Sequence, residues 1–235
     1  MEMPALSDLL DLQDVDLEID RLIDRRQGMP ELEQYREANA ARIQAEADRD
    51  AVAAELRSIE LDLDKAEGEL EILETRLNES ETRLFAGGMS AKETEHKRLE
   101  VRSLEGQKEA SEERVLALLD QRDVLAEKMS ASQQMVASKR ARETGLEEVI
   151  KSAWRDIDRD IGRKEGRKAE IVPTIPPDLL DLYEQLRKTK QGVAIGRLEH
   201  GNCGGCHLAL SAAEQKDAAE TDPARCVHCR RILVF

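Results

Sequence analysis

The chain has 235 residues, a formal net charge of −14, 37% charged residues and 2% aromatic residues. A compact domain of this length normally buries more than the two Phe, two Tyr and one Trp present here, which argues against a globular core. High charge without aromatic bulk leaves disorder or long helices, and the hydrophobic periodicity along the chain favours long helices.

The N-terminal segment has neither the basic start nor the apolar stretch of a secretory signal. No apolar run approaches the ~18 residues that a membrane-spanning helix needs. Every cysteine lies near the C-terminus at metal-site spacing, which suits a reducing compartment better than a disulfide framework. We expect a cytoplasmic protein without membrane contact.

Two apolar seams predict helices in the first part of the chain. Between them lie Gly28 and Pro30. Because proline lacks a backbone donor and collides with the preceding turn, we expect a kink near residues 28–30. The second seam follows an a/d heptad pattern, as in a coiled coil. The first seam contains Leu12, Val15, Ile19 and Leu22, and the second contains Val52, Leu56, Ile59, Leu63, Ala66, Leu70, Leu73, Leu77 and Leu84.

A chain reversal is predicted near residues 85–90. Gly87 and Gly88 permit the positive φ angles that end a helix. Ser90 and Glu93 have the spacing of a capping box, which starts the next helix. We therefore expect an antiparallel hairpin in which residue i pairs with roughly residue 175 − i.

Two apolar residues flank the reversal and are candidate contacts for a partner at the tip. These are Phe85 and Met89. Isolated apolar residues at a surface also occur without a binding role, so packing that holds the turn is the equal alternative.

The second arm of the hairpin is expected to extend to about Ile171, or ~120 Å at 1.5 Å per residue. Its seam is weaker than the heptad seam of the first arm because polar residues interrupt it. Whether the hairpin self-associates through this polar seam is left open. The apolar members are Val101, Leu104, Val115, Leu118, Leu125, Met129, Val136, Leu146, Ile150 and Ile157, and the polar ones are Lys108, Arg122, Ser132, Lys139 and Glu143.

Three prolines within residues 173–177 end the hairpin, since a helix cannot continue through them. An amphipathic helix is expected at 178–190. Strand-like segments at 192–198 and 231–235 then enclose the cysteines, which is the layout of a zinc ribbon. The sequence thus predicts a mainly α protein, with a long antiparallel coiled-coil hairpin over residues 1–172 and a short helix plus zinc ribbon over 173–235.

The four cysteines form two C-x-x-C pairs, Cys203 with Cys206 and Cys226 with Cys229. Thiolates three residues apart on a tight turn can face one metal ion, and two such turns supply the four sulfurs of a tetrahedral zinc site. Buried thiols, a redox pair and an iron–sulfur centre are the alternatives. Because four thiolates close the coordination sphere, we expect one structural Zn²⁺ and no metal-bound water.

Two histidines, His207 and His228, lie beside the cysteines. Either could replace a sulfur ligand or donate a hydrogen bond near the site, but four sulfurs already satisfy zinc. A simple exposed position is the remaining alternative.

The tail from residue 186 onward carries eight Lys or Arg against five Asp or Glu, and is the basic part of an acidic chain. Any phosphate contact should therefore come from the tail. Arg225, Arg230 and Arg231 surround the second cysteine pair and are candidate contacts for phosphate or an acidic partner; ordinary ribbon surface is the alternative.

No catalytic motif accompanies these features: the chain lacks a G-x-S-x-G elbow, a P-loop and an H-E-x-x-H pair. Acidic pairs on a long charged helix are typical of a solvated face. We expect that the protein is not an enzyme.

The sequence resembles a bacterial family of coiled-coil hairpin proteins that end in a C4-type zinc ribbon. The similarity covers nearly the whole chain. In that family a glycine usually follows the last cysteine, where this chain has Arg230. The resemblance rests on LFAGGMSAKE (84–93), IPP (175–177), YE (183–184), GVA (192–194), CGGCHL (203–208) and CVHCRRIL (226–233).

The resemblance implies a non-enzymatic adaptor or regulator that binds protein partners through hairpin and ribbon. Some members act in flagellar or secretion-system regulation, where they bind an alternative sigma factor or a messenger RNA. The expected partners are therefore proteins, with transcription or secretion machinery as candidates. The alternative is a nucleic-acid-binding regulator that contacts DNA or RNA through the basic ribbon.

Overall fold

The computed structural model describes residues 3–235. Within them the chain forms two compact units. The first, here called the ribbon unit, contains the chain up to Glu33 together with 147–235, and the second, the arm unit, contains 34–146. The sequence-based boundary between residues 172 and 173 stays a prediction.

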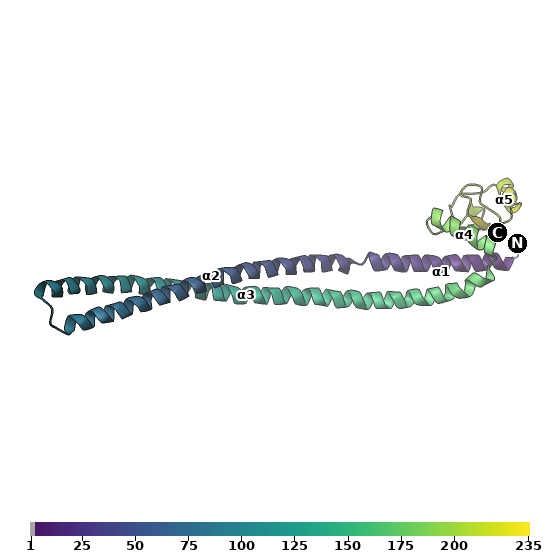
Figure 1. Ribbon diagram of the computed structural model, residues 1–235. Coiled ribbons are helices and arrows are strands. Elements are labelled where there is room, and N and C mark those ends of the chain that lie inside the picture. The colour runs from purple at the N-terminus through teal and green to yellow at the C-terminus, as the bar shows by residue number, and fades with distance from the viewer. Residues whose placement is uncertain (1–2) are drawn as a thin grey trace. The chain divides into compact units, whose positions relative to one another are not determined.

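The predicted fold class, a long helical hairpin followed by a small C-terminal sheet that carries the cysteines, is confirmed (Figure 1). Among the described residues, no helix combines the length and apolar character that crossing a membrane requires. The helices are α1 (Met3–Gln27), α2 (Pro30–Phe85), α3 (Ala91–Ile171), the 3-10 turn η1 (Val172–Thr174), α4 (Pro177–Thr189) and α5 (Ala212–Ala219), and the strands are β1 (Ile195–Glu199), β2 (Asn202–Cys203) and β3 (Ile232–Val234).

In the arm unit, α2 and α3 lie side by side in opposite directions (Figure 1). The predicted seam residues are the ones that turn inward: most are half-buried, and the polar Lys108 and Arg122 are half-buried with them. Small side chains dominate the closest contacts. The buried residues of this unit are Ala38, Ala45, Leu63, Ala66, Ser80 and Val136.

The pairing register differs from the predicted 175 − i. Glu74 faces Lys108 at 3.3 Å, and Asn39 donates to Glu143 at 2.6 Å, so residue i faces about residue 182 − i. The non-helical loop 86–90 explains the shift. An extended chain advances about 3.3 Å per residue and a helix only 1.5 Å, so a reversal need not be symmetric about its glycines. The difference is one heptad, which leaves the same helix faces in contact.

The predicted break near residues 28–30 is present, since α1 ends at Gln27 and α2 begins at Pro30. The single tryptophan holds the end of α1. The Trp154 indole N–H donates to the Arg26 carbonyl oxygen at 3.3 Å, and the Arg26 guanidinium lies 5.1 Å from the centre of the ring. The indole thus satisfies a carbonyl that the break leaves without an intrahelical partner.

The ribbon unit has a continuous apolar core to which α1, α4 and the sheet all contribute. The sheet has the order β2-β1-β3, with β1 antiparallel to β2 and parallel to β3. β1 and β3 therefore pack on the helices instead of forming a free-standing module. The buried members of this core are Ala5, Leu9, Leu12, Val15, Ile171, Ile175, Leu179, Tyr183, Leu186, Ala194, Ile195 and Ile232.

A buried carboxylate links three helices of the same unit. Asp16 is 1% exposed; it accepts from the Tyr183 hydroxyl at 2.7 Å and from Lys168 Nζ at 2.7 Å. Arg187 Nε lies 3.5 Å from Asp16, and its guanidinium also donates to Asp20 at 2.7 Å. Burial raises the pKa of Tyr183, and its hydrogen bond to Asp16 adds to that shift. A buried carboxylate is tolerated because cations and a hydroxyl surround it.

A second buried polar side chain joins α1 directly to the sheet. Gln13 is 6% exposed, and its side-chain amide donates to the Ile195 carbonyl oxygen at 2.9 Å. Its side-chain oxygen accepts from the backbone N–H groups of Ala194 at 2.7 Å and Ile195 at 2.8 Å. The amide thus takes the place of a neighbouring strand at the start of β1.

Candidate metal centre

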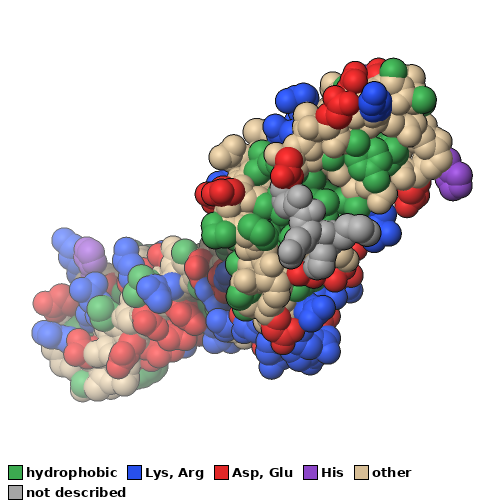
Figure 2. Space-filling model, turned by 90° about the vertical axis from the view of Figure 1, so that its right-hand side faces the viewer, with side chains coloured by type: hydrophobic (Ala, Val, Ile, Leu, Met, Phe, Trp, Pro, Cys, Tyr) green, Lys and Arg blue, Asp and Glu red, His purple; other side chains and the backbone are tan. Residues whose placement is uncertain are grey.

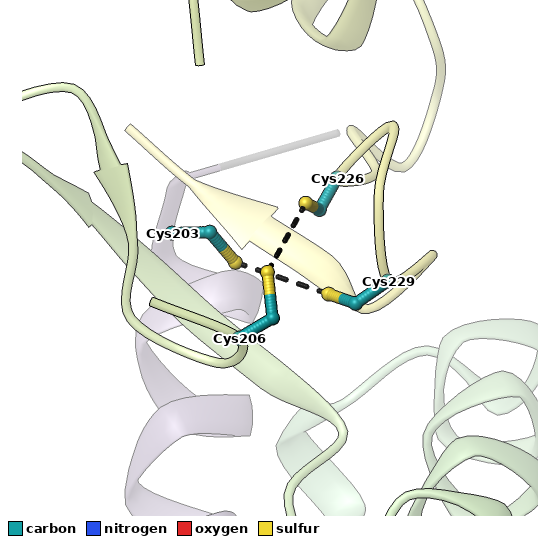
Figure 3. A group of neighbouring side chains, drawn as sticks. All are labelled: Cys203, Cys206, Cys226 and Cys229. Carbon is teal, nitrogen blue, oxygen red and sulfur yellow. Dashed lines mark hydrogen bonds between the residues drawn. The ribbon is translucent and has the colours of Figure 1, made fainter. Parts of the chain in front are cut away.

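The four cysteine sulfurs point toward one another in the ribbon unit (Figure 3). All lie within 4.8 Å of each other, and none forms a disulfide. The Sγ atoms of Cys203 and Cys229 are 3.9 Å apart, as are those of Cys206 and Cys226. A tetrahedral zinc ion with bonds of about 2.3 Å would place sulfur atoms about 3.8 Å apart. The cluster therefore fits one tetrahedral metal ion with four thiolate ligands.

Two tight turns present the sulfurs. Cys203 is held in the sheet by its pairing with Leu198 of β1. In the second turn, Cys226 donates its backbone N–H to the Arg231 carbonyl oxygen at 2.9 Å, just before β3. Because β1 pairs with both β2 and β3, the sheet fixes the distance between the turns.

The glycines of the first turn are required by close contacts, with backbone at Gly204 and with a side chain at Gly205. A Cβ atom on Gly204 would lie 2.9 Å from the Arg197 carbonyl oxygen, and one on Gly205 would lie 2.6 Å from Cδ of Arg231. The Gly205 N–H also lies 3.4 Å from Sγ of Cys203 and donates to it. Gly196 of β1 makes the same approach from the other side, since a Cβ there would lie 2.6 Å from the Gly205 nitrogen.

The residue after each second cysteine has a left-handed backbone, with φ of 62° at His207 and 63° at Arg230. Each closes its turn by donating its backbone N–H to the carbonyl oxygen of the first cysteine of the pair. The distance is 2.7 Å from His207 to Cys203 and 2.9 Å from Arg230 to Cys226. Glycine adopts this conformation without strain. The geometry explains why glycine is the usual residue where this chain has Arg230.

The metal-free thiols differ in their acidity. Burial raises the pKa of Cys203 to about 12. Burial also acts to raise the pKa of Cys229, but hydrogen bonds from the backbone and side chain of Arg231 and from the Cys206 and Cys226 side chains together outweigh it and lower that pKa to about 7. A metal binds the thiolate form, so a bound cation would favour loss of the proton from each of the four cysteines.

The two neighbouring histidines lie outside the sulfur cluster. Nε2 of His228 lies 3.3 Å from the Ala209 carbonyl oxygen and 3.7 Å from the Glu214 carboxylate. Among the described residues, neither His207 nor His228 belongs to the group of side chains that could hold a metal. His228 instead connects the second turn to the start of α5.

Of the three arginines singled out in the sequence, two have roles within the fold. Arg231 donates to the carbonyl oxygens of Val193 at 2.7 Å and Lys190 at 3.1 Å. Arg225 donates to the Arg230 carbonyl oxygen at 3.1 Å. On the face shown in Figure 2, Lys and Arg side chains form several groups with Asp and Glu beside them. Arg230, which is exposed, is the one best placed to reach a partner.

The two candidate tip residues lie in the arm unit and differ in exposure. Phe85 is 83% exposed, whereas Met89 is half-buried. Phe85 is the last residue of α2, and Met89 lies within the loop that joins α2 to α3.

Sequence patterns did not identify the polar residues that tie the ribbon to the helices. Gln13 and Asp16 sit between the apolar members of the first seam, where a polar residue is expected to face solvent. The one available signal was Tyr183 on the apolar face of the tail helix, because a buried tyrosine hydroxyl usually finds a polar partner.

Comparison with known proteins places the chain among hairpin proteins. A family model described as the CT398-like coiled coil hairpin domain matches residues 12–191. The Mycobacterium tuberculosis protein named "Uncharacterized protein Rv2229c" is 24% identical over 229 residues, which cover 96% of this chain and 93% of the relative.

Two solved structures share the fold. A protein from Mycobacterium smegmatis has a TM-score of 0.84 at 22% identity, covering 99% of this chain and 98% of the other. CT398 from Chlamydia trachomatis has a TM-score of 0.71 at 19% identity, covering 98% of this chain and 97% of the other. At these identities the similarity shows the fold alone.

Proposed function

This chain belongs to the CT398-like coiled-coil hairpin family, and we propose that it is a non-enzymatic, zinc-binding adaptor of the cytoplasm. In this proposal the hairpin and the ribbon each present a surface to a protein partner, with transcription or secretion machinery as the candidates. The observation that carries the proposal is the closed cluster of four sulfurs within 4.8 Å of one another.

The proposed metal is one structural Zn²⁺. Four thiolates at tetrahedral spacing match the preference of zinc and leave no open position for a reacting water. The ion would fix the two turns to each other, while the polar contacts of α1 hold the sheet on the helices. The ribbon would then be a rigid surface for a partner.

The test has two parts. Metal analysis of the protein, purified without added metal, should find one zinc per chain, lost from the Cys226→Ser variant. Affinity capture from the native cell should then recover proteins that the Cys226→Ser variant fails to recover, with His207→Ala, in the other cysteine turn, as a control. A protein without bound metal, or identical captures from both variants, would refute the proposal.

The second candidate is a regulator that binds DNA or RNA through the ribbon. It is favoured by the exposed Arg230 in a tail that carries eight basic residues against five acidic ones. Direct phosphate contact should give an affinity that falls steeply with salt and weakens in Arg230→Gln. No detectable binding of DNA or RNA at low salt would eliminate this candidate.

A further inference from the structure

The sign of the charge changes along the arm unit. Residues 34–82 contain 14 Asp or Glu and six Lys or Arg, a net charge of −8. Residues 83–98, around the tip, contain four Lys or Arg and two Asp or Glu, a net charge of +2. The tip is therefore a basic end on an acidic helix. It should attract acidic surfaces, whereas the acidic helix should attract basic ones.

The tip also carries the most exposed large apolar side chain of the described residues. Phe85 is 83% exposed at the last position of α2, whereas the next in order, Leu61, is 64% exposed. A phenylalanine buries a large apolar area when a partner covers it, and a ring already placed at a helix end is a rigid anchor.

The turn does not depend on Phe85 for its structure. Ser90 donates its backbone N–H to the Glu93 carboxylate at 2.8 Å, and Glu93 donates its own N–H to the Ser90 hydroxyl at 3.3 Å. This is the capping box expected from the sequence. Since these contacts and the left-handed Gly87 and Gly88 shape the loop, an exposed ring is not needed to hold the turn.

A surface hollow of about 420 Å³ lies beside Met89 at the same end. Arg83, Lys92 and His96 are among the residues that line it. The hollow therefore combines an apolar side chain with cationic groups.

The acids of this hollow are already engaged. Glu93 serves the capping box, and the hydrogen bonds from Ser90 lower its pKa. Glu100 accepts from Lys97 Nζ at 2.8 Å and from the Ser80 hydroxyl at 3.3 Å, and these contacts lower its pKa as well.

Two of the cations remain available. Within the described part of the chain neither Arg83 nor Lys92 forms a salt bridge within 4.0 Å, although the charge of Arg83 helps to lower the pKa of Glu93. They lie at the end of α2 and the start of α3, on the two sides of the loop. A ligand at the hollow would therefore meet positive charge from both sides of the loop, beside the apolar Met89.

We propose that this tip is a docking site for a short acidic segment of a partner protein that also carries apolar side chains. Phe85 and Met89 contact the apolar side chains, and Arg83 and Lys92 contact the carboxylates. The inference deepens the proposed adaptor function and rests on it, because it names the chemistry of the hairpin's partner.

The observations favour a protein segment over a nucleic acid. An extended polyanion that passes the tip would also run along the helix with net charge −8, which repels it. Successive bases need several aromatic platforms, and residues 83–98 supply one phenylalanine and one histidine, with no Tyr or Trp. A short peptide can end within the basic region.

The test uses the full chain with its metal bound and a labelled peptide that alternates Glu with Leu. Fluorescence anisotropy should show binding that is lost when every Glu is replaced by Gln. Phe85→Ser, and separately Arg83→Gln with Lys92→Gln, should each weaken binding about tenfold, as expected for anchor residues. Circular dichroism should confirm that each variant keeps the helical content of the parent.

Matched controls lie on the same helix. Leu61→Ser removes an exposed apolar residue and Arg57→Gln an exposed cation, and both should leave the affinity within about twofold, as for residues outside the contact. Equal binding of the Gln peptide, or equal losses in the controls, would overturn the proposal. So would tighter Phe85-dependent binding of a short RNA or of anionic lipid vesicles. These outcomes leave the metal content and the ribbon-dependent captures unchanged, so a failure here is distinct from a failure of the proposed function.

Discussion

The ribbon unit and the arm unit are stabilised in different ways. Large side chains of the ribbon unit are fully buried: Leu9, Leu12, Tyr183, Ile195 and Ile232 are all at most 1% exposed. Half of the residues buried in the arm unit are alanines, and only Leu63 and Val136 are larger apolar ones. One unit is a packed core with buried polar links, and the other is a repeated shallow seam.

The contrast predicts where single substitutions matter. Full burial of a large apolar side chain contributes about 1.5–3 kcal/mol to stability. Removing one partner of a buried hydrogen bond is costly because the other partner is left unsatisfied, whereas replacing both partners by apolar groups costs less. In a seam of half-buried positions, each residue contributes a small part of the stability, and the fold does not depend on any single one. Substitutions in the ribbon unit should therefore have large, local effects, and those in the arm unit small ones.

The largest effect should follow loss of the metal cluster. Cys203→Ser should abolish stoichiometric zinc binding and unfold the chain from about residue 192, while most helical circular dichroism remains. Binding of structural zinc contributes roughly 10 kcal/mol or more to the segment that holds it. Metal analysis and limited proteolysis measure both changes.

His207→Ala is the control, since this residue is in the first turn but outside the sulfur cluster. Loss of most helical signal in Cys203→Ser would contradict the prediction, because the helices would then depend on the metal.

Removal of the buried carboxylate should be next in size. Asp16→Ala leaves Lys168, Arg187 and the Tyr183 hydroxyl without their shared partner, and should destabilise the ribbon unit by about 3 kcal/mol. Urea unfolding measures the loss. Asp14→Ala, at an exposed position of the same helix, should change stability by less than about 0.5 kcal/mol. Equal effects of the two variants would show that the buried cluster is not a stabilising link.

Gln13→Ala should cost about 2 kcal/mol, since it leaves buried backbone groups at the start of β1 without partners. The loss should be local. Amide hydrogen exchange should accelerate first at Ala194 and Ile195, and unchanged protection there would rule out the proposed role of this side chain.

Arg230→Gly should be neutral or stabilising by up to about 1 kcal/mol, because it removes a side chain from a left-handed position. Thermal unfolding of the zinc-bound protein measures it. A clear loss of stability would mean that the Arg230 side chain has a structural role in the ribbon.

The smallest effect is expected in the arm unit and depends on pH. Hydrogen bonds from Asn39 and Arg42 lower the pKa of Glu143 below its ordinary value of 4.5. Their stabilisation is therefore complete above pH 4.5 and is lost as the pH falls through the lowered pKa. Glu143→Gln should narrow the difference between melting temperatures at neutral and acid pH. An unchanged difference would exclude this contact as a source of acid sensitivity.

The helices, their breaks and the cysteine cluster could be predicted because each depends on local chemistry. Heptad spacing predicted the seams of the coiled coil, and Pro30 predicted the break between α1 and α2. The two C-x-x-C pairs predicted the cysteine cluster. The pairing register could not be predicted, because one heptad of displacement satisfies the same seam and only the path of loop 86–90 selects between registers.

The contacts of Gln13 and Asp16 could not be predicted from the sequence either. They join positions more than 150 residues apart, and the partners include backbone groups, which carry no sequence signal. Likewise, the sequence identified Arg225 and Arg231 by charge, but their carbonyl contacts depend on the folded ribbon.

Hydrogen exchange of the zinc-loaded and chelated protein tests the central claim most directly. If metal and buried polar links hold the ribbon unit while the arm unit is stabilised by its own seam, chelation should accelerate exchange in residues 195–235 and around Gln13 of α1. Exchange in residues 34–146 should stay the same. A uniform acceleration across both units, or no change near the cysteines, would contradict the account.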